Sequence, residues 1–176
     1  MRPVLTHGVF NLAIDSLTCL WGGLIAPRLC GEQMTRSLEP FAHLISFQST
    51  VGEDTHLSKE NYFAICQSDN RTSEVGNNAC CMVALFAYET LKVDAKFESI
   101  KNQVPVQFLY HLRNASAHGN RFNFFRDRNR TRFRDPGTVQ WNKKTIDKAL
   151  QDMPAFPDFF AAGDFAYLLE DVSQLM

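Results

Sequence analysis

The sequence predicts a mainly α-helical protein that carries one basic insert, either a short β-hairpin or an extended segment. Apolar residues recur at spacings of three and four through the first two-thirds of the chain, which is the period of a helix with one buried face. After Gly119 the period changes, and aromatic and arginine residues alternate with polar ones, as they do in strands. The chain has 176 residues, 45% of them apolar and 21% charged, so it is long enough to bury a core. We therefore expect one domain, residues 1–176, with the insert at residues 120–141.

Residues that start or stop helices divide the chain into elements. Pro27 ends the first helical pattern, and Ser58 is a suitable N-cap for a short helix. Pro105 is well placed in a first helical turn, because its missing N–H has no intrahelical partner there. Asn142 and Asp164 are further candidates to open helices. The expected helices are residues 10–24, 38–48, 58–66, 73–91, 105–119, 142–150 and 164–175, with a short helical turn within 94–103. Loops are expected at residues 52–55 and 70–72.

The basic character of the protein is concentrated in one segment. The net charge is −1, but residues 121–134 contain six arginines and one aspartate. Arginine beside aromatic residues suits a nucleic-acid backbone, so we expect this segment to bind backbone phosphates without reading the bases. A solvated surface loop is the alternative. The candidate substrate-binding residues are Arg121, Arg126, Arg128 and Arg130.

Cysteine usage and hydropathy indicate a cytoplasmic protein. The five cysteines are odd in number and include no C-x-x-C pair, which favours a reducing compartment over a disulfide framework or a zinc site. The apolar stretch 9–26 is interrupted by Asn11, Asp15 and two glycines, so we expect no membrane segment. We expect neither a metal nor a cofactor.

The densest polar cluster stands at the end of the apolar helix 105–119. Asn114 and His118 lie four residues apart, on one face of a helix. Arg113 lies about 140° away from His118 around the helix axis, so joint action of the two needs a kink, a helix end or a second copy. His111, one turn before Ala115, is a candidate to line the same cleft.

These residues resemble the HEPN domain family. Arg113-Asn114-x-x-x-His118 matches the R-x4–6-H signature of that family, including the Asn that often follows the Arg. The Gly after the His, the extended aromatic segment behind it and the element at 141–146 also look HEPN-like. The specific match covers some 35 residues, while the helices before it are generic.

The resemblance implies a bundle of four to five core helices that pairs as a homodimer, with two motifs facing each other across a cleft. It implies a stand-alone protein of the toxin or phage-defence branch, a metal-independent endoribonuclease with RNA as substrate and an antitoxin protein as a further partner. The chemistry agrees with this expectation. Attack of the RNA 2′-OH on the adjacent phosphorus needs a proton-transfer group that titrates near neutrality and a fixed positive charge. We therefore expect His118 to transfer the proton, Arg113 to stabilise charge and Asn114 to orient the ring or bind a phosphate oxygen.

Each residue also has an ordinary structural interpretation. His118 would cap its helix through the last carbonyls, Arg113 would pair with a surface acid, and Asn114 would be a satisfied core amide. Two further hypotheses therefore stand beside the ribonuclease. One is a non-catalytic HEPN module that binds RNA or a protein as a regulator. The other is a helical interaction protein unrelated to HEPN domains, with an acidic C-terminus that meets a basic region.

Overall fold

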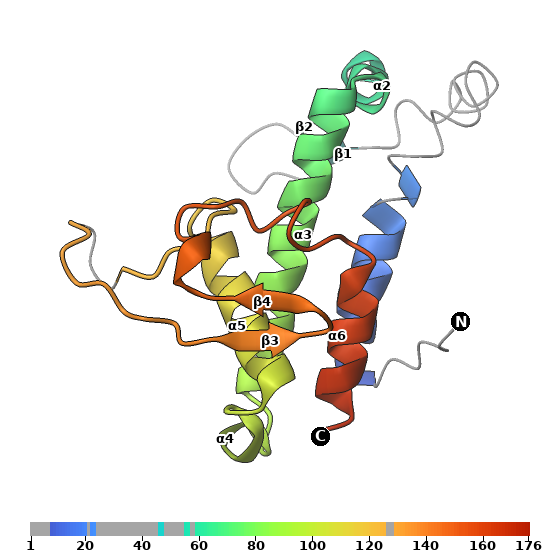
Figure 1. The fold of residues 1–176 in the computed structure, drawn as a ribbon. Coiled ribbons are helices and arrows are strands. Elements are labelled where there is room, and N and C mark those ends of the chain that lie inside the picture. Colours follow the sequence, from blue (N-terminus) through green and yellow to red (C-terminus); the bar gives the residue numbers. More distant parts are fainter. Residues whose placement is uncertain (1–7, 21, 24–45, 48–54, 57–58, 126–128) are drawn as a thin grey trace. The chain divides into compact units, whose positions relative to one another are not determined.

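The computed structural model is mainly helical with two short antiparallel strand pairs (Figure 1). It describes residues 8–20, 22–23, 46–47, 55–56, 59–125 and 129–176. Contacts group the chain into two compact units, one of residues 1–17 with 77–176 and the other of residues 18–76. The candidate site lies in the unit of residues 1–17 and 77–176.

The smaller unit, residues 18–76, contains one strand pair and helix α2. β1 (Ser46–Phe47) pairs antiparallel with β2 (Thr55–His56), and α2 (Lys59–Gln67) follows. α2 confirms the short helix expected from Ser58 onward. The helix expected over 38–48 is wrong at 46–47, since these residues pair as a strand with Thr55–His56. Short apolar runs do not distinguish helix from strand. The rest of that segment lies outside the described residues.

The break expected at residues 70–72 is absent, because α3 (Asp69–Lys92) begins earlier than the sequence indicated. Ser68 acts as its N-cap, with its Oγ accepting the Arg71 N–H at 3.4 Å. Thr72, inside the predicted break, donates its hydroxyl to the Ile65 carbonyl at 2.9 Å and is buried. Asp69 stands in the first turn, where its negative charge interacts favourably with the positive end of the helix dipole. Side-chain capping at Ser68 and Thr72 therefore carries the chain from α2 into α3 with almost no loop.

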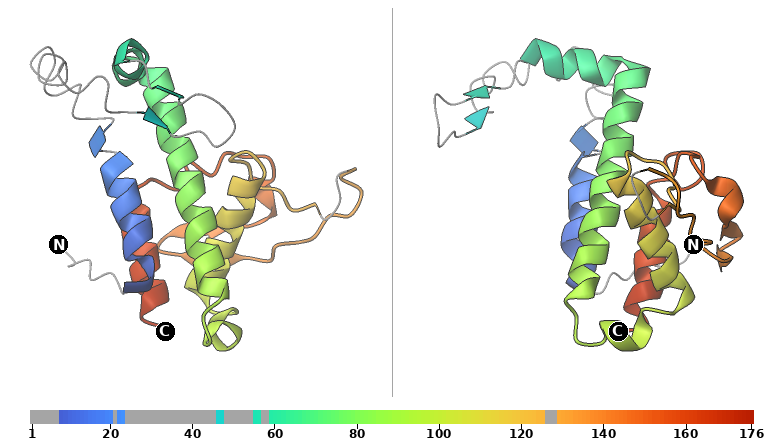
Figure 2. Two further views of the ribbon diagram at one scale, coloured as in Figure 1. Left: turned by 180° about the vertical axis from the view of Figure 1, so that it is seen from behind. Right: turned by 90° about the vertical axis from the view of Figure 1, so that its left-hand side faces the viewer.

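The larger unit packs helices around a phenylalanine-rich core. It contains a 3₁₀ turn, η1 (Gly8–Phe10), helical residues 11–17, most of α3, α4 (Phe97–Ile100), α5 (Val104–Ala117) and α6 (Asp164–Ser173). α5 lies between α3 and the extended segments that follow it (Figure 2). These elements confirm the expected short turn within 94–103 and the helices opened by Pro105 and Asp164. The largest fully buried side chains include Phe10, Phe108, Phe122, Phe156, Phe160 and Phe165.

The β-hairpin lies further along the chain than predicted. β3 (Val139–Trp141) pairs with β4 (Lys144–Ile146), and Asn142 and Lys143 form the turn with φ of 43° and 67°. The helix expected over 142–150 is therefore wrong, apart from the 3₁₀ turn η3 (Lys148–Leu150). Asn favours both helix N-caps and left-handed turns, and here the turn prevails because it buries Trp141 and Ile146 together. Trp141 packs against Phe108 of α5, with ring centroids 5.4 Å apart.

The described parts of the predicted insert, residues 120–125 and 129–141, are largely extended, and contacts with the C-terminal quarter of the chain hold them. Arg121 bridges to Pro154, and Phe125 bridges to Phe133. Asn120, in the left-handed region at φ 65°, donates from Nδ2 to the Phe156 carbonyl at 2.8 Å and accepts the Phe156 N–H on Oδ1 at 2.9 Å. The chain that follows α5 is thus fixed at Asn120 by a residue 36 positions further along the sequence.

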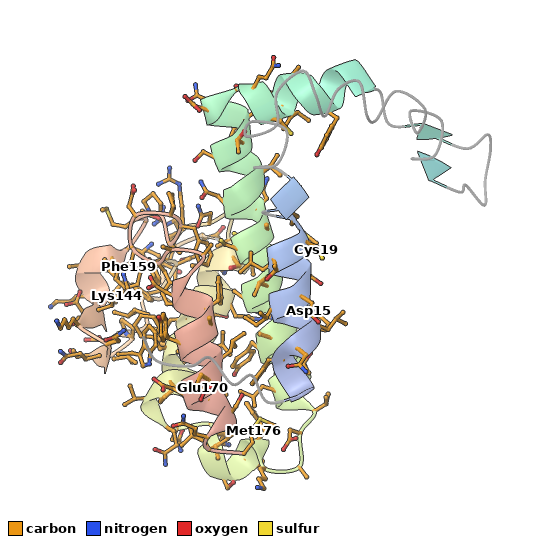
Figure 3. All side chains as sticks on the ribbon, turned by 90° about the vertical axis from the view of Figure 1, so that its right-hand side faces the viewer. Asp15, Cys19, Lys144, Phe159, Glu170 and Met176 are labelled. Atoms are coloured by element: carbon orange, nitrogen blue, oxygen red, sulfur yellow. The ribbon has the colours of Figure 1, made fainter. Side chains whose placement is uncertain are left out.

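A second contact braces the same C-terminal quarter. Lys144 donates to the Phe159 carbonyl at 2.8 Å, and its Nζ lies 3.3 Å from the Asp164 carboxylate (Figure 3). Because Asp164 opens α6 and Lys144 opens β4, this contact joins the hairpin to the last helix. The hairpin and α6 therefore both pack on α5 and are joined to each other.

Two further expectations concern cysteines and membranes. All four cysteines in the described residues are free thiols; Cys66, Cys80 and Cys81 are buried and Cys19 is exposed. Burial, and then the neighbouring Cys81, raises the pKa of Cys80 to about 12, as expected for an apolar helix interior. None of the helices in the described part of the chain combines the length and the apolar composition that a bilayer span requires.

Candidate functional site

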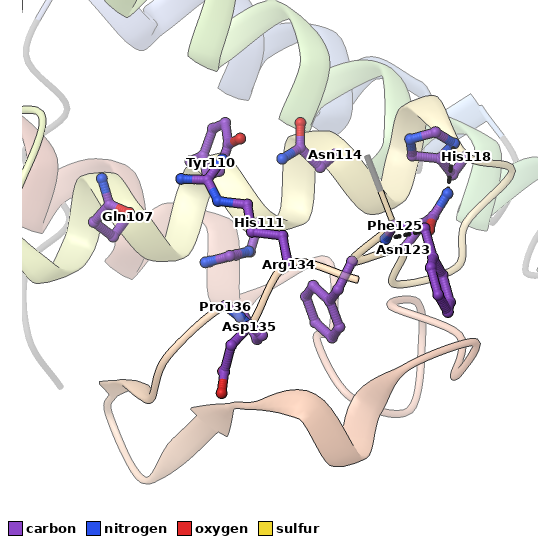
Figure 4. Close-up of a pocket in the computed structure, with 11 residues that line it drawn as sticks. Gln107, Tyr110, His111, Asn114, His118, Asn123, Phe125, Arg134, Asp135 and Pro136 are labelled. Atoms are coloured by element: carbon purple, nitrogen blue, oxygen red, sulfur yellow. Dashed lines mark hydrogen bonds between the residues drawn. The ribbon is translucent and has the colours of Figure 1, made fainter. Parts of the chain in front are cut away.

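A pocket of about 250 Å³ runs along α5 in the larger unit. One wall is α5 itself and the other is the extended segment after it (Figure 4). The helical wall contributes Gln107, Tyr110, His111, Asn114 and His118. The extended wall contributes Asn123, Phe124, Phe125, Arg134, Asp135 and Pro136. Two of the three predicted catalytic residues, Asn114 and His118, therefore share one pocket.

The helical wall follows from residue spacing. Gln107, His111, Asn114 and His118 are separated by four, three and four residues, so they form one stripe along α5. The opposite faces of the helix are apolar and buried, with Val106, Phe108, Leu109, Leu112 and Ala115 in the core. A polar stripe on an otherwise buried helix is the signal that marks this wall in the sequence.

His118 ends α5 and stands at the C-terminal end of the pocket. Its backbone N–H donates to the Ala115 and Asn114 carbonyls at 3.1 and 3.2 Å, so it is the helix C-cap. Its ring is exposed, and Nδ1 lies 3.3 Å from Nδ2 of Asn123. Gly119 follows with φ of 69°, a conformation that suits glycine and turns the chain away from the helix. His118 therefore ends its helix through its backbone N–H, while its ring contacts Asn123 rather than the last carbonyls of the helix.

Asn123 fixes which nitrogen of His118 is available. The Oδ1 of Asn123 accepts the Phe125 N–H at 3.0 Å, which assigns the amide orientation and leaves Nδ2 facing the His118 ring. An amide nitrogen donates only, so Nδ1 of a neutral His118 is the acceptor and Nε2 carries the proton. Nε2 is then the ring nitrogen left for a substrate.

His111 forms part of the pocket at its opposite, N-terminal end. The side chain is only 7% exposed and packs edge-on against Tyr110 and Phe124. Burial, and then the positive charge of Arg134, lowers the pKa of His111 to about 4. His111 is therefore neutral at physiological pH. The sequence placed it as a candidate for the cleft, and the structure brings it there.

Arg113 faces away from the pocket, toward α3. Its Nη2 and Nε donate to Oε1 of Glu89 at 2.6 and 3.0 Å. The Arg113 guanidinium, and then Lys92, holds the pKa of Glu89 below its usual value. Arg113 also approaches Oδ1 of Asn114 at 3.4 Å, which leaves the Asn114 Nδ2 group for the pocket. Its position agrees with the alternative of pairing with a surface acid, and it acts on the pocket through Asn114.

The arginine cluster is partly neutralised within the chain. Arg121 donates to the Asp152 carbonyl at 2.7 Å, and Arg130 forms an ion pair with the Asp152 carboxylate. The guanidinium of Arg130 also lies 4.8 Å from the ring centroid of Phe125, a pocket residue. Neither arginine lines the pocket. The other two candidates, Arg126 and Arg128, lie outside the described residues.

Arg134 is the pocket cation that sequence reasoning did not single out. Its backbone N–H donates to the Phe124 carbonyl at 2.7 Å, which aligns the two strands of the insert and brings its side chain to the pocket. Strand alternation alone assigns Arg128, Arg130, Arg132 and Arg134 to the same face. Only the long-range pairing distinguishes Arg134 from the rest.

The described residues contain no group of three or more His, Cys, Asp or Glu side chains placed to hold a metal ion. No protein-family model matches this chain, and no curated protein and no solved structure is similar enough to count as a match.

Proposed function

We propose that the protein is an endoribonuclease that cleaves RNA by attack of a 2′-OH on the adjacent phosphorus, with proton transfer by its own side chains. The observation that carries the proposal is the position of the exposed His118 ring at the pocket. Nδ1 of this ring is bonded to Asn123, and Nε2 is left for substrate. The reaction forms a bond between O2′ and phosphorus and breaks the bond to O5′. Its products are a 2′,3′-cyclic phosphate and a 5′-OH end.

His118 transfers a proton through Nε2. In the tautomer that Asn123 favours, Nε2 carries a proton and can give it to the leaving 5′ oxygen. Taking the 2′-OH proton at Nε2 requires the other tautomer, in which Nδ1 carries the proton and no longer accepts from Asn123. One histidine performs only one of these roles in a single step. A second copy of α5, in the HEPN-type homodimer that the motif resembles, supplies the second His118.

Arg134 and Asn114 stabilise the charge that develops on the phosphorane. Arg134 brings a guanidinium to the pocket, and Asn114 presents Nδ2 because its Oδ1 faces Arg113. Arg134 therefore takes the role that the sequence assigned to Arg113. Arg113 remains a positioning residue, which holds the Asn114 amide in the orientation that donates into the pocket.

A single experiment tests this proposal. Purified protein is incubated with an end-labelled single-stranded RNA in EDTA, and the product ends are identified by mass spectrometry. We expect cleavage that leaves a 2′,3′-cyclic phosphate and that stops when the sugar at the cut site is 2′-deoxy. Products with a 5′-phosphate and a free 3′-OH, or cleavage that requires Mg²⁺, would refute the mechanism.

One observation favours a second function, a non-catalytic RNA-binding or protein-binding module of the same kind. The arginine of the HEPN-like motif is held by Glu89 and does not reach the pocket. RNA binding with no cleavage by the wild-type protein would select this alternative. A toxin or phage-defence role, with an antitoxin as partner, follows only from the ribonuclease.

A further inference from the structure

Arg134 lines the pocket, and its guanidinium forms no ion pair or hydrogen bond with the described residues. Other arginines of the larger unit are paired. Arg113 forms an ion pair with Glu89, at 2.6 Å. Arg130 forms one with Asp152. Because a guanidinium is always charged and carries five N–H donors, an unpaired one in a pocket wall is suited to an anionic ligand.

Neutral hydrogen-bond donors accompany this cation. The Arg134 guanidinium lies beside Tyr110 and His111 of α5 (Figure 4). The hydroxyl of Tyr110 can donate, and Asn114, one turn further along the helix, presents its Nδ2 group to the pocket. The carboxylate of Asp135 points away from Tyr110 and His111 (Figure 4). This part of the pocket therefore offers one positive charge and several donors to an oxyanion.

His111 is the group beside Arg134 whose charge can change. The side chain is 7% exposed and packs edge-on against Tyr110 and Phe124. Tyr88, which packs on Tyr110 from α3, is uncharged, since burial raises the pKa of its hydroxyl. Within the described part of the chain, Arg134 is the charged group that lowers the pKa of His111, and it adds to the effect of burial.

An oxyanion bound at Arg134 reverses this electrostatic effect. Its negative charge offsets the guanidinium and attracts an imidazolium, so the pKa of His111 rises from about 4 toward the ordinary value of about 6.5. Between those two values the bound form of the protein holds more protons than the free form. By linkage, binding then takes up a proton, and the affinity for the anion increases as the pH falls.

We propose that the pocket binds a phosphate group of a polynucleotide backbone against Arg134, Asn114 and Tyr110, and that His111 takes up a proton as this phosphate binds. The protonated ring is then a second cation beside the phosphate. The assignment rests on the proposed function in one respect, since it takes RNA as the natural ligand, but it does not require cleavage. It makes RNA affinity depend on pH through a residue other than His118.

Binding of a short oligothymidylate tests the assignment without cleavage, because its 2′-deoxy sugars lack the nucleophile. Each phosphodiester carries one negative charge throughout the range used, so the pH dependence of binding comes from the protein. The titrations use the His118→Gln protein, in which His118 cannot contribute a proton. Isothermal titration calorimetry in two buffers with different enthalpies of ionisation measures the affinity and the number of protons taken up.

We expect the affinity to increase roughly tenfold between pH 7 and pH 5, the change that one added proton gives over this range. Proton uptake should approach one per bound phosphate site at the lower pH. Circular dichroism at each pH confirms that the protein stays folded. An affinity that does not change with pH, or binding without proton uptake, would overturn the proposal.

Matched variants identify the two residues that act together. Arg134→Gln should weaken binding at least about tenfold, since it removes a charged donor to the phosphate. Arg132→Gln, which removes an exposed charge of the same segment outside the pocket, should weaken it less. His111→Gln should remove the pH dependence, and His56→Gln, in β2 of the smaller unit, should retain it. Equal losses for the two arginine variants, or a pH dependence that survives His111→Gln, would contradict the proposal.

A measurement with His111 in place covers the case in which His111→Gln does not fold. NMR titration of the histidine ring protons gives the pKa of His111 with and without the oligothymidylate. We expect a value of about 4 without it and an increase of at least about one unit when it is bound. An unchanged pKa would overturn the proposal whatever the variants do.

Proton-linked binding and cleavage can fail separately. RNA cleavage by a protein whose His111 does not respond to the oligothymidylate would overturn this assignment and leave the ribonuclease standing. Proton-linked binding by a protein that cleaves no RNA would do the opposite. Sulfate serves as a free oxyanion, and we expect it to compete with the oligothymidylate. Sulfate that binds with proton uptake but does not compete would contradict the assignment to a polynucleotide backbone.

Discussion

The two walls of the pocket are built in different ways. The α5 wall is a regular helix whose side-chain directions follow from local spacing and from Pro105 in its first turn. The opposite wall has almost no regular structure, and contacts with the C-terminal quarter of the chain hold it. Phe124 donates its N–H to Gln151 Oε1, and Asn120 is bonded on both sides of the Phe156 peptide.

This difference separates the positions that local spacing determines from those that the whole fold determines. Asn114 and His118 lie in the pocket because they are four residues apart on a helix. Arg134 lies there because its strand pairs with Phe124. The arginine of the pocket, which lies beside His111, therefore comes from the less regular wall. Each prediction below perturbs one wall and compares it with the other.

The largest effect is expected at the helical wall. His118→Ala should lower the rate of RNA cleavage by roughly a hundred- to ten-thousandfold, since general acid–base catalysis contributes that much. The ring is exposed, so the thermal midpoint should hardly change. Single-turnover rates and a thermal melt measure the two quantities.

Asn123→Ala should move the pH–rate profile, because Asn123 selects the Nε2-protonated form of His118. An unchanged profile would mean that Asn123 has no role in the site.

The next effect distinguishes the two arginines. Arg134→Ala should lower cleavage by roughly a hundredfold or more, as expected for a lost donor to a developing oxyanion. Arg113→Ala should cost less, because its guanidinium is bonded to Glu89 and reaches the pocket only through Asn114. Lys96→Ala, which removes an exposed charge outside the pocket, serves as control. A larger loss for Arg113→Ala than for Arg134→Ala would restore the role that the sequence assigned to Arg113.

A third effect appears in stability against pH. The pKa of His111 is about 4 in the folded protein and about 6.5 in an unfolded chain, so the unfolded state binds more protons between these values. The free energy of unfolding should therefore fall by about 3 kcal/mol as the pH drops from about 6.5 to 4. His111→Gln should lose this part of the pH dependence while the carboxylates still titrate. Urea unfolding of both proteins between pH 4 and 7.5 measures the difference, and parallel curves would contradict it.

The smallest effect is expected in the arginine cluster of the extended wall. Arg130 is already paired with Asp152, so its replacement by Ala removes a charge that is partly neutralised. We expect the slope of log affinity for RNA against log salt to fall by less than about 1. Fluorescence anisotropy at four salt concentrations measures it. A fall of about 1 would mean that RNA displaces Asp152 from Arg130 and contradict this expectation.

Much of the helical half could be predicted from the sequence. Apolar spacing and Pro105 located α5, and the four-residue step placed Asn114 with His118. The 140° offset of Arg113 correctly indicated that it diverges from His118, but spacing alone does not show that Glu89 of α3 receives it. The turn at Asn142 was misassigned because its residues favour a helix start as well as a left-handed turn. Arg134 could not be distinguished from the other arginines, since only a pairing between distant residues selects it.

The hydrogen bonds of Asn120 to Phe156 have a consequence for biosynthesis. Proteins are made from the N-terminus, and α5 with its His118 leaves the ribosome well before residue 156 does. Until residue 156 emerges, Asn120, which follows α5, lacks its hydrogen-bond partner, and the extended wall lacks the contacts that hold it. The complete pocket therefore forms only near the end of translation. A nascent chain therefore contains His118 before the pocket around it is complete.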